Sequence, residues 1–386
     1  MSLGELTHNA LEVLPKGELE RKLELGRPLR VKLGIDVTTP EVTLGHGVPL
    51  QRMAAFQREG HIGVLIVGDY TTRIGDPSGR STTRPILSEE EIDRNAKSYF
   101  EQASAIIDPE RTELRFNSEW LGKLDYAEIV RLARTATVAR LLERDDFAKR
   151  FAAQEPISLS ELLYPIMQGY DSVAVEADVE LGGSDQLYNL LMGREIMQAY
   201  GLEPQVALTV ELLLSWDGQL MSQSKGNYMG LMEAPEEQFG KAMRISDSLL
   251  PQWYRLLMEA DEPSGDPLEA KLELARFIVR RSHGDDAARS AEDHFTRVVR
   301  EGEAPEDAPE ADLPEGDGVV HVPALLVEHL GIASTSEARR LVAQGGVKVN
   351  GEVVSELDLP RESLEGALVQ AGKRRFVRFR GPGAAP

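Results

Sequence analysis

Four groups of polar residues have types and spacings that could bind a phosphate group or recognise a polar ligand. In the first group, residues 36–40 (DVTTP) and 43–46 (TLGH) lie where a predicted strand gives way to a predicted helix. Backbone N–H groups at a helix start bind phosphate, and a glycine beside His46 lets a substrate approach closely. The alternative is a loop in which His46 caps the helix.

The second group is residues 75–80 (GDPSGR) followed by Arg84. It lacks the Gly-Lys-Ser/Thr ending of a Walker A loop, and Asp-Pro-Ser-Gly is also ordinary turn chemistry. In the third group, Tyr164, Gln168 and Asp171 are offset by four and seven positions. This spacing puts a hydroxyl, an amide and a carboxylate on one face of a helix, although a solvated stripe would have the same spacing.

Two further polar segments follow along the chain. Residues 182–186 (GGSDQ) form a second strand-to-helix turn after the third group. Residues 220–227 (LMSQSKGN) make the fourth group, a polar loop that closes this half of the chain. A surface loop without function would have a similar composition.

Alternating strands and helices must position these groups. The sequence predicts strands over 29–35, 61–67, 114–117 and 178–181, and helices over 48–59, 88–107, from Ser158, and over 187–200. The run HIGVLIV is typical of a strand buried on both faces of a parallel sheet. Ser88 with Glu91, and Ser158 with Glu161, are capping boxes. This repetition predicts a doubly wound, Rossmann-like α/β domain with ligands at the carboxyl ends of its strands.

The second half of the chain has a different organisation. Residues 234–300 are predicted to be mostly helical, and the acidic, proline-rich residues 301–317 to be a linker. A small α+β unit follows, with a helix from Ser334, a strand over 347–349, a hairpin turn at Asn350-Gly351 and a basic strand over 373–380. The tail 381–386 is predicted to be disordered.

Composition limits the class of protein. The 386 residues carry a net charge of −21, contain 41% hydrophobic residues and include no cysteine. A wholly disordered chain, disulfides, a thiolate nucleophile and Cys-ligated zinc are therefore excluded. We expect a cytoplasmic protein, because no apolar run reaches the length of a membrane helix and residues 1–13 lack a signal-peptide core. The acidity first argues against a nucleic-acid partner, but the linker holds much of it.

Taken together, the four groups resemble the motifs of bacterial tyrosyl-tRNA synthetases, which are class I aminoacyl-tRNA synthetases. Residues 43–46 are similar to the HIGH motif and residues 221–224 to KMSKS, and the resemblance runs from near Leu11 to about Arg380. It implies a catalytic domain over 1–228 with a dimer-interface insertion around 120–150, and a helical anticodon-arm domain over 229–300. It further implies an acidic linker over 301–318, an S4-like RNA-binding domain over 319–381 and a tail over 382–386.

The resemblance implies roles for individual residues. Tyrosine would be bound by Lys32, Thr71, Asp76, Tyr164, Gln168, Asp171 and Gln186. ATP would be bound by Gly34, Asp36, Thr43, Gly45, His46, Gly183, Asp185, Met221, Ser222, Gln223, Ser224 and Lys225. Thr38, His46, Arg80, Arg84 and Lys225 would act in catalysis, and Arg339, Arg340, Lys348, Lys373, Arg374 and Arg375 would form a basic patch for RNA. Asp171 would accept the phenol hydrogen bond, and Lys32 stands where many members have a tyrosine that touches the same hydroxyl.

The implied activity is that of a tyrosine–tRNA ligase. It would activate L-tyrosine with ATP and Mg²⁺, release pyrophosphate and transfer tyrosine to tRNA(Tyr), as a homodimer that uses residues 126–147 and without a bound metal or organic cofactor. Three positions depart from the motifs: Thr43 replaces the first histidine of HIGH, and Leu220 and Gln223 replace the two lysines of KMSKS. We expect Lys225, Arg80 and Arg84 to supply the missing charge.

Two other functions stay open. The departures also fit a non-catalytic RNA-binding paralogue that has lost its ATP chemistry, although such a protein would not require Asp76, Tyr164, Gln168 and Asp171. A small-molecule nucleotidyltransferase would share the α/β half of the chain, but it would not explain the S4-like end.

Overall fold

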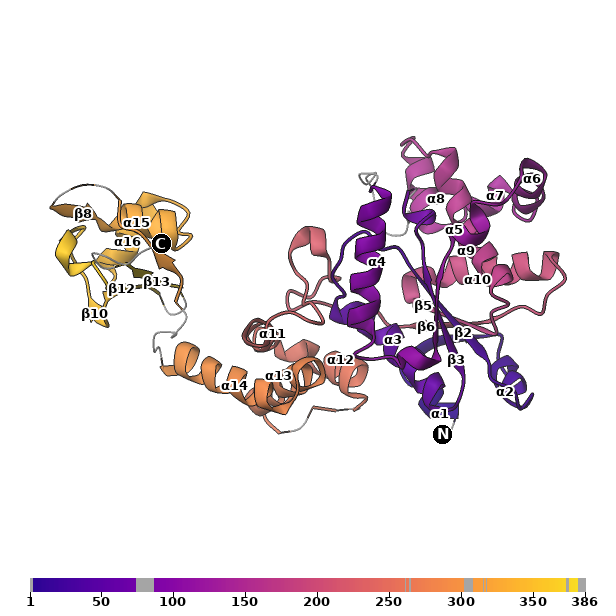
Figure 1. The fold of residues 1–386 in the computed structure, drawn as a ribbon, viewed down its shortest axis with the longest axis horizontal. Helices are drawn as coiled ribbons and strands as arrows, with labels where there is room; N and C mark the ends of the chain where they lie inside the picture. The colour runs from indigo at the N-terminus through magenta and orange to yellow at the C-terminus, as the bar shows by residue number, and fades with distance from the viewer. Residues whose placement is uncertain are drawn as a thin grey trace. The chain divides into compact units, whose positions relative to one another are not determined.

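The chain folds into two compact units, Met1–His283 and Gly284–Pro386, in a computed structural model (Figure 1). The structure describes residues 3–73, 87–260, 262–263, 265–301, 308–314, 316, 318–372 and 375–380. Each unit is described by itself.

The first unit is built on a six-stranded sheet of order β1-β6-β5-β2-β3-β4. Its strands are β1 (Ala10–Leu14), β2 (Arg30–Ile35), β3 (Ile62–Val67), β4 (Thr112–Phe116), β5 (Val179–Gly183) and β6 (Val206–Val210). All pairings are parallel except that of β1 with β6. The chain runs from β2 through β3 to β4 on one side and places β5 and β6 on the other. The predicted doubly wound fold is confirmed, with its ligand-binding switch point at the carboxyl ends of β2 and β5.

Helices cover both faces of this sheet (Figure 1). The main ones are α3 (Leu44–Arg58), α4 (Glu89–Ala103), α9 (Leu159–Ala174) and α10 (Leu187–Ala199). A Cβ atom on Gly63 of β3 would lie 2.9 Å from Met53 Sδ, so α3 packs closely on that face. Because side chains alternate along a strand, the adjacent position Val64 and its partner Lys32 point to the opposite face, on which α9 lies.

Both predicted capping boxes are confirmed, since Ser88 caps α4 and Ser158 caps α9. Helix α3 begins at Leu44, four residues before the predicted start at 48, because the side chain of Thr43 caps it. Strands β1 and β6 were not identified from the sequence.

Further helical elements complete the first unit. They are α1 (Leu3–Leu6), α2 (Glu18–Leu23), η1 (Thr71–Arg73), η2 (Pro109–Arg111), α5 (Ser118–Leu121), α6 (Tyr126–Ala133), α7 (Val138–Leu141), α8 (Asp145–Ala152), η3 (Ser184–Gln186), η4 (Gln223–Lys225), α11 (Pro235–Ala242), η5 (Asp247–Leu249), α12 (Leu250–Trp253), η6 (Tyr254–Met258) and α13 (Pro267–His283). Over the described ranges, no helix combines the length and apolar character needed to cross a bilayer.

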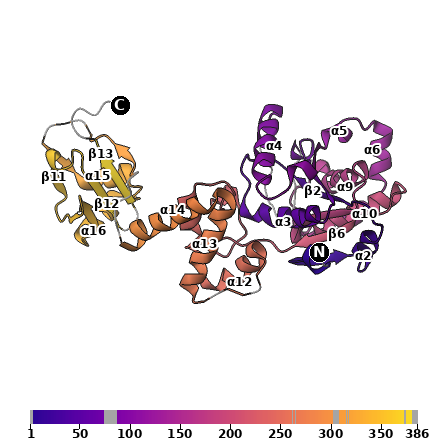
Figure 2. The ribbon, with the colours of Figure 1, turned by 60° about the horizontal axis from the view of Figure 1, so that its bottom comes forward.

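The second unit packs helices against a small sheet (Figure 2). Its helical elements are α14 (Asp285–Phe295), η7 (Thr296–Glu301), α15 (Val322–His329), α16 (Thr335–Ala343) and η8 (Arg361–Ser363). The sheet has the order β10-β9-β12-β13-β7, from β10 (Glu352–Val353), β9 (Val347–Val349), β12 (Leu368–Ala371), β13 (Arg375–Phe379) and β7 (Glu310–Ala311). A second pair joins β8 (Val319–His321) to β11 (Asp358–Pro360). The core includes Leu326, Val369 and Phe379.

Two features of this unit bear on the sequence predictions. The Asn350-Gly351 turn has φ values of 49° and 86°, which the tight hairpin between β9 and β10 requires, so that prediction is confirmed. Part of the predicted linker instead forms β7, which pairs in parallel with β13. The acidic composition hid single apolar residues, such as Leu313, that are buried against the core. Residues 302–307 and the tail 381–386 lie outside the described residues.

Candidate active site

Hydrogen bonds join four of the predicted site residues where β2 and β3 end. Asp36 directly follows β2, and the Tyr164 hydroxyl donates to its Oδ2 over 3.0 Å. The Thr71 hydroxyl donates to Asp36 Oδ1 over 2.9 Å. Asn117 then donates through Nδ2 to Thr71 Oγ1 at 3.1 Å and to Asp171 Oδ2 at 3.4 Å. Segments more than 100 positions apart in sequence thus make one continuous network.

The backbone at Gly68 makes this network possible. A Cβ atom there would lie 2.3 Å from both Asp36 Oδ1 and Thr71 Oγ1. Any larger residue would force these two side chains apart.

Asp171 is a buried acid whose pKa is strongly perturbed. Its side chain is 3% exposed, and Trp120 Nε1 donates to Oδ1 over 2.8 Å. Burial raises the pKa of Asp171 to about 7, while the charge of Lys32 and the hydrogen bonds from Trp120 and Asn117 lower it. Because Tyr164 is also buried, at 6% exposed, the interpretation of a solvated stripe is wrong.

A second set of contacts holds the amide side chains of the site. Asn189 on α10 donates through Nδ2 to Gln168 Oε1 at 3.0 Å and to Gln186 Oε1 at 2.9 Å. The buried Arg144 donates in turn to Asn189 Oδ1 at 3.3 Å. The structure therefore brings Gln168 and Gln186 together through a residue that was not predicted.

Sequence reasoning missed Asn117, Trp120 and Asn189. Asn117 directly follows β4 and Trp120 lies in the next short helix, α5, so their place just beyond the carboxyl end of a parallel strand is the signal that could have found them. Asn189 lies inside α10 and carries no such signal.

Lys32 lies beneath this site instead of facing it. Its side chain is fully buried, and Nζ donates to Glu180 Oε1 at 2.8 Å, to Ser172 Oγ at 2.8 Å and to the backbone oxygen of Gln168 at 3.0 Å. All three N–H donors of the ammonium group are thereby used within the protein. The prediction of direct contact between Lys32 and a substrate does not fit this geometry.

At the start of α3, His46 and Thr43 cap each other. Thr43 N donates to His46 Nδ1 over 3.2 Å, and His46 N donates to Thr43 Oγ1 over 3.4 Å. The capping interpretation is therefore correct, but it does not exclude a function. Because Nδ1 accepts a hydrogen bond, we assign the ring proton to Nε2. Since the cap uses Nδ1, Nε2–H is left outside the cap as a donor.

The fourth group lies beside the first, although about 180 residues separate them. Leu44 N donates to Met229 O at 2.9 Å, and Leu231 N donates to Val42 O at 2.6 Å. A Cβ atom on Gly45 would lie 3.9 Å from Met221 Sδ. The N-terminus of α3 and the loop over 220–227 thus form one region.

Gln223 ties this loop to the segment after β2. Its Oε1 accepts from Thr39 Oγ1 at 2.5 Å, and its Nε2 donates to Glu41 O at 3.0 Å. Ser222 N is held by Asn227 Oδ1 at 2.9 Å. Lys225 is exposed, with Nζ 3.4 Å from Gln219 Oε1.

The other predicted nucleotide residues lie at the switch point or outside the described residues. Gly34 is the residue before the last one of β2, with no atom within 4 Å of the place a Cβ would occupy, and Gly183 ends β5 with Asp185 in the following turn. Thr38 N donates to Asp36 O at 2.9 Å. Asp76, Arg80 and Arg84, and the side chain of Ser224, lie outside the described residues. Within the described ranges, no group of three or more His, Asp or Glu side chains could hold a metal ion.

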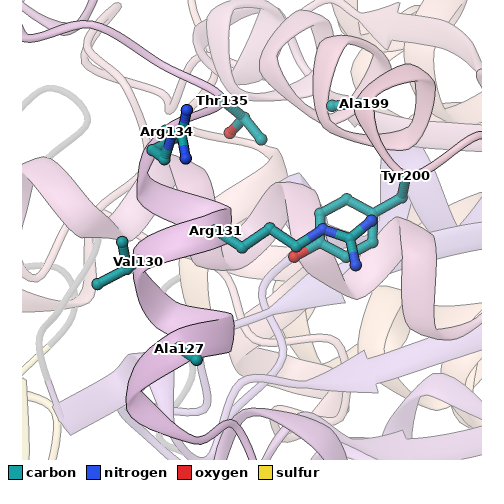
Figure 3. A pocket seen from close by; sticks show the side chains of 7 residues that line it. All are labelled: Ala127, Val130, Arg131, Arg134, Thr135, Ala199 and Tyr200. Atoms are coloured by element: carbon teal, nitrogen blue, oxygen red, sulfur yellow. The ribbon is translucent and has the colours of Figure 1, made fainter.

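A separate pocket of about 350 Å³ lies between α6 and the end of α10 (Figure 3). None of the predicted site residues lines this pocket. Its lining residues are Ala127, Val130, Arg131, Arg134, Thr135, Ala199 and Tyr200. The Arg131 guanidinium lies 4.4 Å from the centre of the Tyr200 ring.

The predicted RNA-binding residues of the second unit do not share one face of the sheet. Arg339 and Arg340 are exposed on α16. Lys348 pairs with Gln370, and Arg375 with the next residue, Ala371. Since neighbouring positions on a strand point to opposite faces, Lys348 and Arg375 project in opposite directions. Lys373 and Arg374 lie outside the described residues.

Comparisons with known proteins give the family. The model for tRNA synthetases class I (W and Y) matches residues 24–300, and the S4 domain model matches residues 324–358. The tyrosine–tRNA ligase of Moorella thermoacetica is 48% identical, over 97% of this chain and 94% of the relative. The chain belongs to the tyrosine–tRNA ligase family of class I tRNA synthetases. The tyrosine–tRNA ligase of Thermotoga maritima is 45% identical, over 97% of this chain and 96% of the relative.

Solved structures of tyrosyl-tRNA synthetases share the fold. A truncated mitochondrial tyrosyl-tRNA synthetase from Aspergillus nidulans matches with a TM-score of 0.62 and 22% identity, covering 76% of this chain and 92% of that one. The tyrosyl-tRNA synthetase of Archaeoglobus fulgidus, complexed with L-tyrosine, matches with a TM-score of 0.62 and 23% identity, covering 75% and 98%. The resemblance stated from the sequence is confirmed.

Proposed function

We propose that the protein is a tyrosine–tRNA ligase, which activates L-tyrosine with ATP and then transfers it to the 3′ end of tRNA(Tyr). One observation carries the assignment of the amino-acid site: Asp171 and Tyr164 are buried and hydrogen-bonded on one face of α9, beside the switch point of the sheet. Relatives named tyrosine–tRNA ligase support this activity over the non-catalytic alternative.

The first step is an in-line displacement at phosphorus. The tyrosine carboxylate attacks the α-phosphorus of ATP, a carboxylate–phosphorus bond forms, and pyrophosphate leaves with the electrons of the bond that breaks. Because the nucleophile is already ionised, no general base is required. The protein contributes positioning and the neutralisation of charge on pyrophosphate.

We assign the tyrosine side of the site to α9 and the residues around it. The carboxylate of Asp171 would accept the phenol hydrogen bond, in surroundings dry enough to strengthen that bond. The Tyr164 hydroxyl donates its proton to Asp36, so its oxygen can accept a hydrogen bond from the substrate ammonium group. Gln168, held by Asn189, would accept another. Phenylalanine would bury the Asp171 carboxylate without the phenol donor, leaving only the donors Trp120 and Asn117, which is costly.

The phosphate side is assigned to the first turn of α3 and the loop over 220–227. His46, with its ring proton on Nε2, would donate to a phosphate oxygen. Gln223, which replaces a lysine of the motif, holds the loop against residues 39–41 and brings no charge. We therefore propose that Lys225, Arg80 and Arg84 neutralise the leaving pyrophosphate. Mg²⁺ would enter as part of the ATP substrate, since phosphate oxygens are its preferred ligands.

A homodimer is part of this proposal. Large apolar side chains are exposed on α6 and α7: Tyr126 at 81%, Val138 at 59%, and Ile129 and Val130 at 42% each. Such a concentration of exposed apolar surface is typical of an interaction site. A second copy of this chain is the partner that we propose for it.

We further propose that the second unit binds tRNA. Its sequence matches the S4 domain model over residues 324–358, and Arg339 and Arg340 present two unconditional positive charges to solvent. The cytoplasmic location expected from the sequence stays a prediction.

Aminoacylation of tRNA(Tyr) by the full chain tests the proposed function. We expect tyrosine to be charged and phenylalanine to be charged far more slowly. A folded protein that binds tRNA(Tyr) but neither charges it nor exchanges pyrophosphate into ATP would instead be the RNA-binding paralogue.

A further inference from the structure

A buried ion pair lies directly beneath the proposed tyrosine site. Lys32 of β2 and Glu180 of β5 are in register on adjacent parallel strands, and their side chains are 0% and 1% exposed. Gln205 Nε2 and Ser172 Oγ donate to Glu180 Oε2 at 2.7 Å and 3.1 Å. Both charges are therefore paired and further hydrogen-bonded, which is the condition for keeping ions in a protein interior.

The ammonium group of this pair fixes one turn of α9. It donates to the backbone oxygen of Gln168 at the start of that turn and to Ser172 Oγ at its end. Between these two anchors lies Asp171, and Gln168 itself reaches Asn189. One strand residue thus holds the backbone that carries both the amide and the carboxylate of the site.

Helices α9 and α10 cross closely above the pair. A Cβ atom on Gly169 would lie 3.1 Å from Gly193 Cα, and one on Gly193 would lie 2.6 Å from Gln205 Nε2. This crossing seals the pair from solvent and leaves little room for the turn to shift by itself.

We propose that the Lys32–Glu180 pair is a positioning device that sets the discrimination of tyrosine from phenylalanine, through the placement and charge state of Asp171. Lys32 is a positioning residue in this proposal and does not touch the substrate. The inference rests on the proposed function, and it assigns a role to the position where the sequence departs from many members of the family.

The electrostatics of the pair give the proposal a specific signature. Among the described residues, the charged groups near Asp171 are Lys32 on β2, Glu180 on β5 and Asp36, which is linked to it through Thr71 and Asn117. The neutral donors to Asp171 there are Trp120 and Asn117. The charge of Lys32 lowers the pKa of Asp171, and the charge of Glu180 raises it. Removing the charge of Glu180 alone should therefore lower the pKa of Asp171. Removing both charges should raise it, because the effect of Lys32 is the larger of the two.

The test uses two variants of the full chain. Glu180→Gln keeps the shape of the side chain and its acceptor oxygen, but leaves the charge of Lys32 without a counter-charge. Lys32→Met with Glu180→Gln removes both charges and avoids an unpaired buried carboxylate, which would itself destabilise the protein. For each variant, kcat/KM for tyrosine in pyrophosphate exchange is measured from pH 5.5 to 9, together with the tyrosine-to-phenylalanine ratio of kcat/KM.

We expect the pH midpoint of kcat/KM to fall in Glu180→Gln and to rise in the double variant, because this parameter reports the titration of the free enzyme. The tyrosine-to-phenylalanine ratio should fall by about tenfold or more in the double variant, since a turn released by even 1 Å weakens a positioned contact strongly. Both effects should appear in KM more than in kcat.

Lys22→Met is the matched control. Lys22 on α2 is also a buried lysine, 1% exposed, and its Nζ lies 3.7 Å from Oδ1 of Asp178, the residue just before β5. It makes no hydrogen bond with residues 168–172 that would tie it to the site. We expect its pH midpoint and its ratio to equal those of the wild type.

Two results would overturn the proposal: a double variant whose ratio and midpoint match the wild type, or a shift in the same direction in both charge variants. If the double variant does not fold, which the loss of its thermal transition would show, Glu180→Gln alone tests the proposal. An unchanged pH midpoint of kcat/KM in Glu180→Gln would then overturn the proposal. An inactive wild type would refute the proposed function and, with it, this inference, whereas an active wild type with an unchanged double variant would refute this inference alone.

Discussion

Replacing Asp171 by asparagine separates recognition of the substrate from stability of the fold. The change is isosteric, but it exchanges one carboxylate oxygen for an NH₂ group. Since Oδ1 accepts from Trp120 and Oδ2 accepts from Asn117, one of these donors must then face another donor. The charged acceptor for the phenol is lost at the same time.

The loss in substrate recognition follows from the kind of bond removed. A hydrogen bond to a charged group is worth about 1.5–3 kcal/mol, which corresponds to roughly 10- to 150-fold in kcat/KM. We expect this loss for tyrosine. For phenylalanine, which offers no hydroxyl, we expect little loss or a gain.

Stability should respond in the opposite sense. Burial raises the pKa of Asp171 from 3.8 to about 7, so the folded state holds this proton more tightly than the unfolded chain. The stabilising effect of the protonated acid is complete below pH 4 and is lost as the pH rises through about 7. Three units of pKa correspond to at most about 4 kcal/mol. Asparagine does not titrate, so the variant does not lose stability in this way as the pH rises. The free energy of unfolding of Asp171→Asn should therefore increase relative to that of the wild type between pH 5 and pH 8.

The assays are pyrophosphate exchange with tyrosine and phenylalanine, and thermal unfolding at pH 5 and pH 8. Asp178→Asn is the control, because Asp178 is also buried but is bound by Arg27 at 2.7 Å through both oxygens and has a lowered pKa. It should lose stability at pH 8 and keep its preference for tyrosine. The reasoning is refuted if Asp171→Asn retains kcat/KM for tyrosine within twofold.

Four other perturbations probe separate parts of the molecule. Gly68→Ala puts a Cβ atom 2.3 Å from Asp36 and Thr71 and should lower kcat/KM for tyrosine by about 10²-fold; exchange kinetics check this, and wild-type activity would contradict it. Lys225→Ala should slow activation by about 10²-fold, the effect of losing one donor to developing charge, and a change below twofold in a single-turnover assay would remove Lys225 from the mechanism. Tyr126→Asp with Val138→Asp should weaken the proposed dimer by about 30-fold or more, as loss of an interface anchor does, and an unchanged mass by light scattering would place the interface elsewhere. A chain ending at His283, where the first compact unit ends, should form tyrosyl-adenylate but charge tRNA(Tyr) poorly. Equal loss of both activities would argue against assigning adenylate formation to the first unit and tRNA binding to the second.

Local signals in the sequence account for the parts that were predicted. The apolar run that became β3 and the capping boxes at Ser88 and Ser158 are patterns of adjacent residues, and the structure reproduces them. The offsets among Tyr164, Gln168 and Asp171 likewise depend on one helix alone. Such features need no knowledge of the rest of the fold.

The remainder depended on contacts between distant segments. Asn117, Trp120 and Asn189 hold the site through tertiary hydrogen bonds, which no spacing within one element reveals. Lys32 aligned with a substrate-facing position, yet its partner across the strand pair, Glu180, turns it into the interior. Strand β7 was hidden because its pairing with β13, and not its composition, makes it a strand.

Tyrosine-dependent exchange of labelled pyrophosphate into ATP by the full chain tests the central claim most directly, because it measures adenylate formation without tRNA. We predict exchange that requires tyrosine, is poorly supported by phenylalanine, and increases as the pH rises through about 7, where Asp171 ionises. Folded protein that shows no exchange with tyrosine, or equal exchange with phenylalanine, would contradict the assignment of this site.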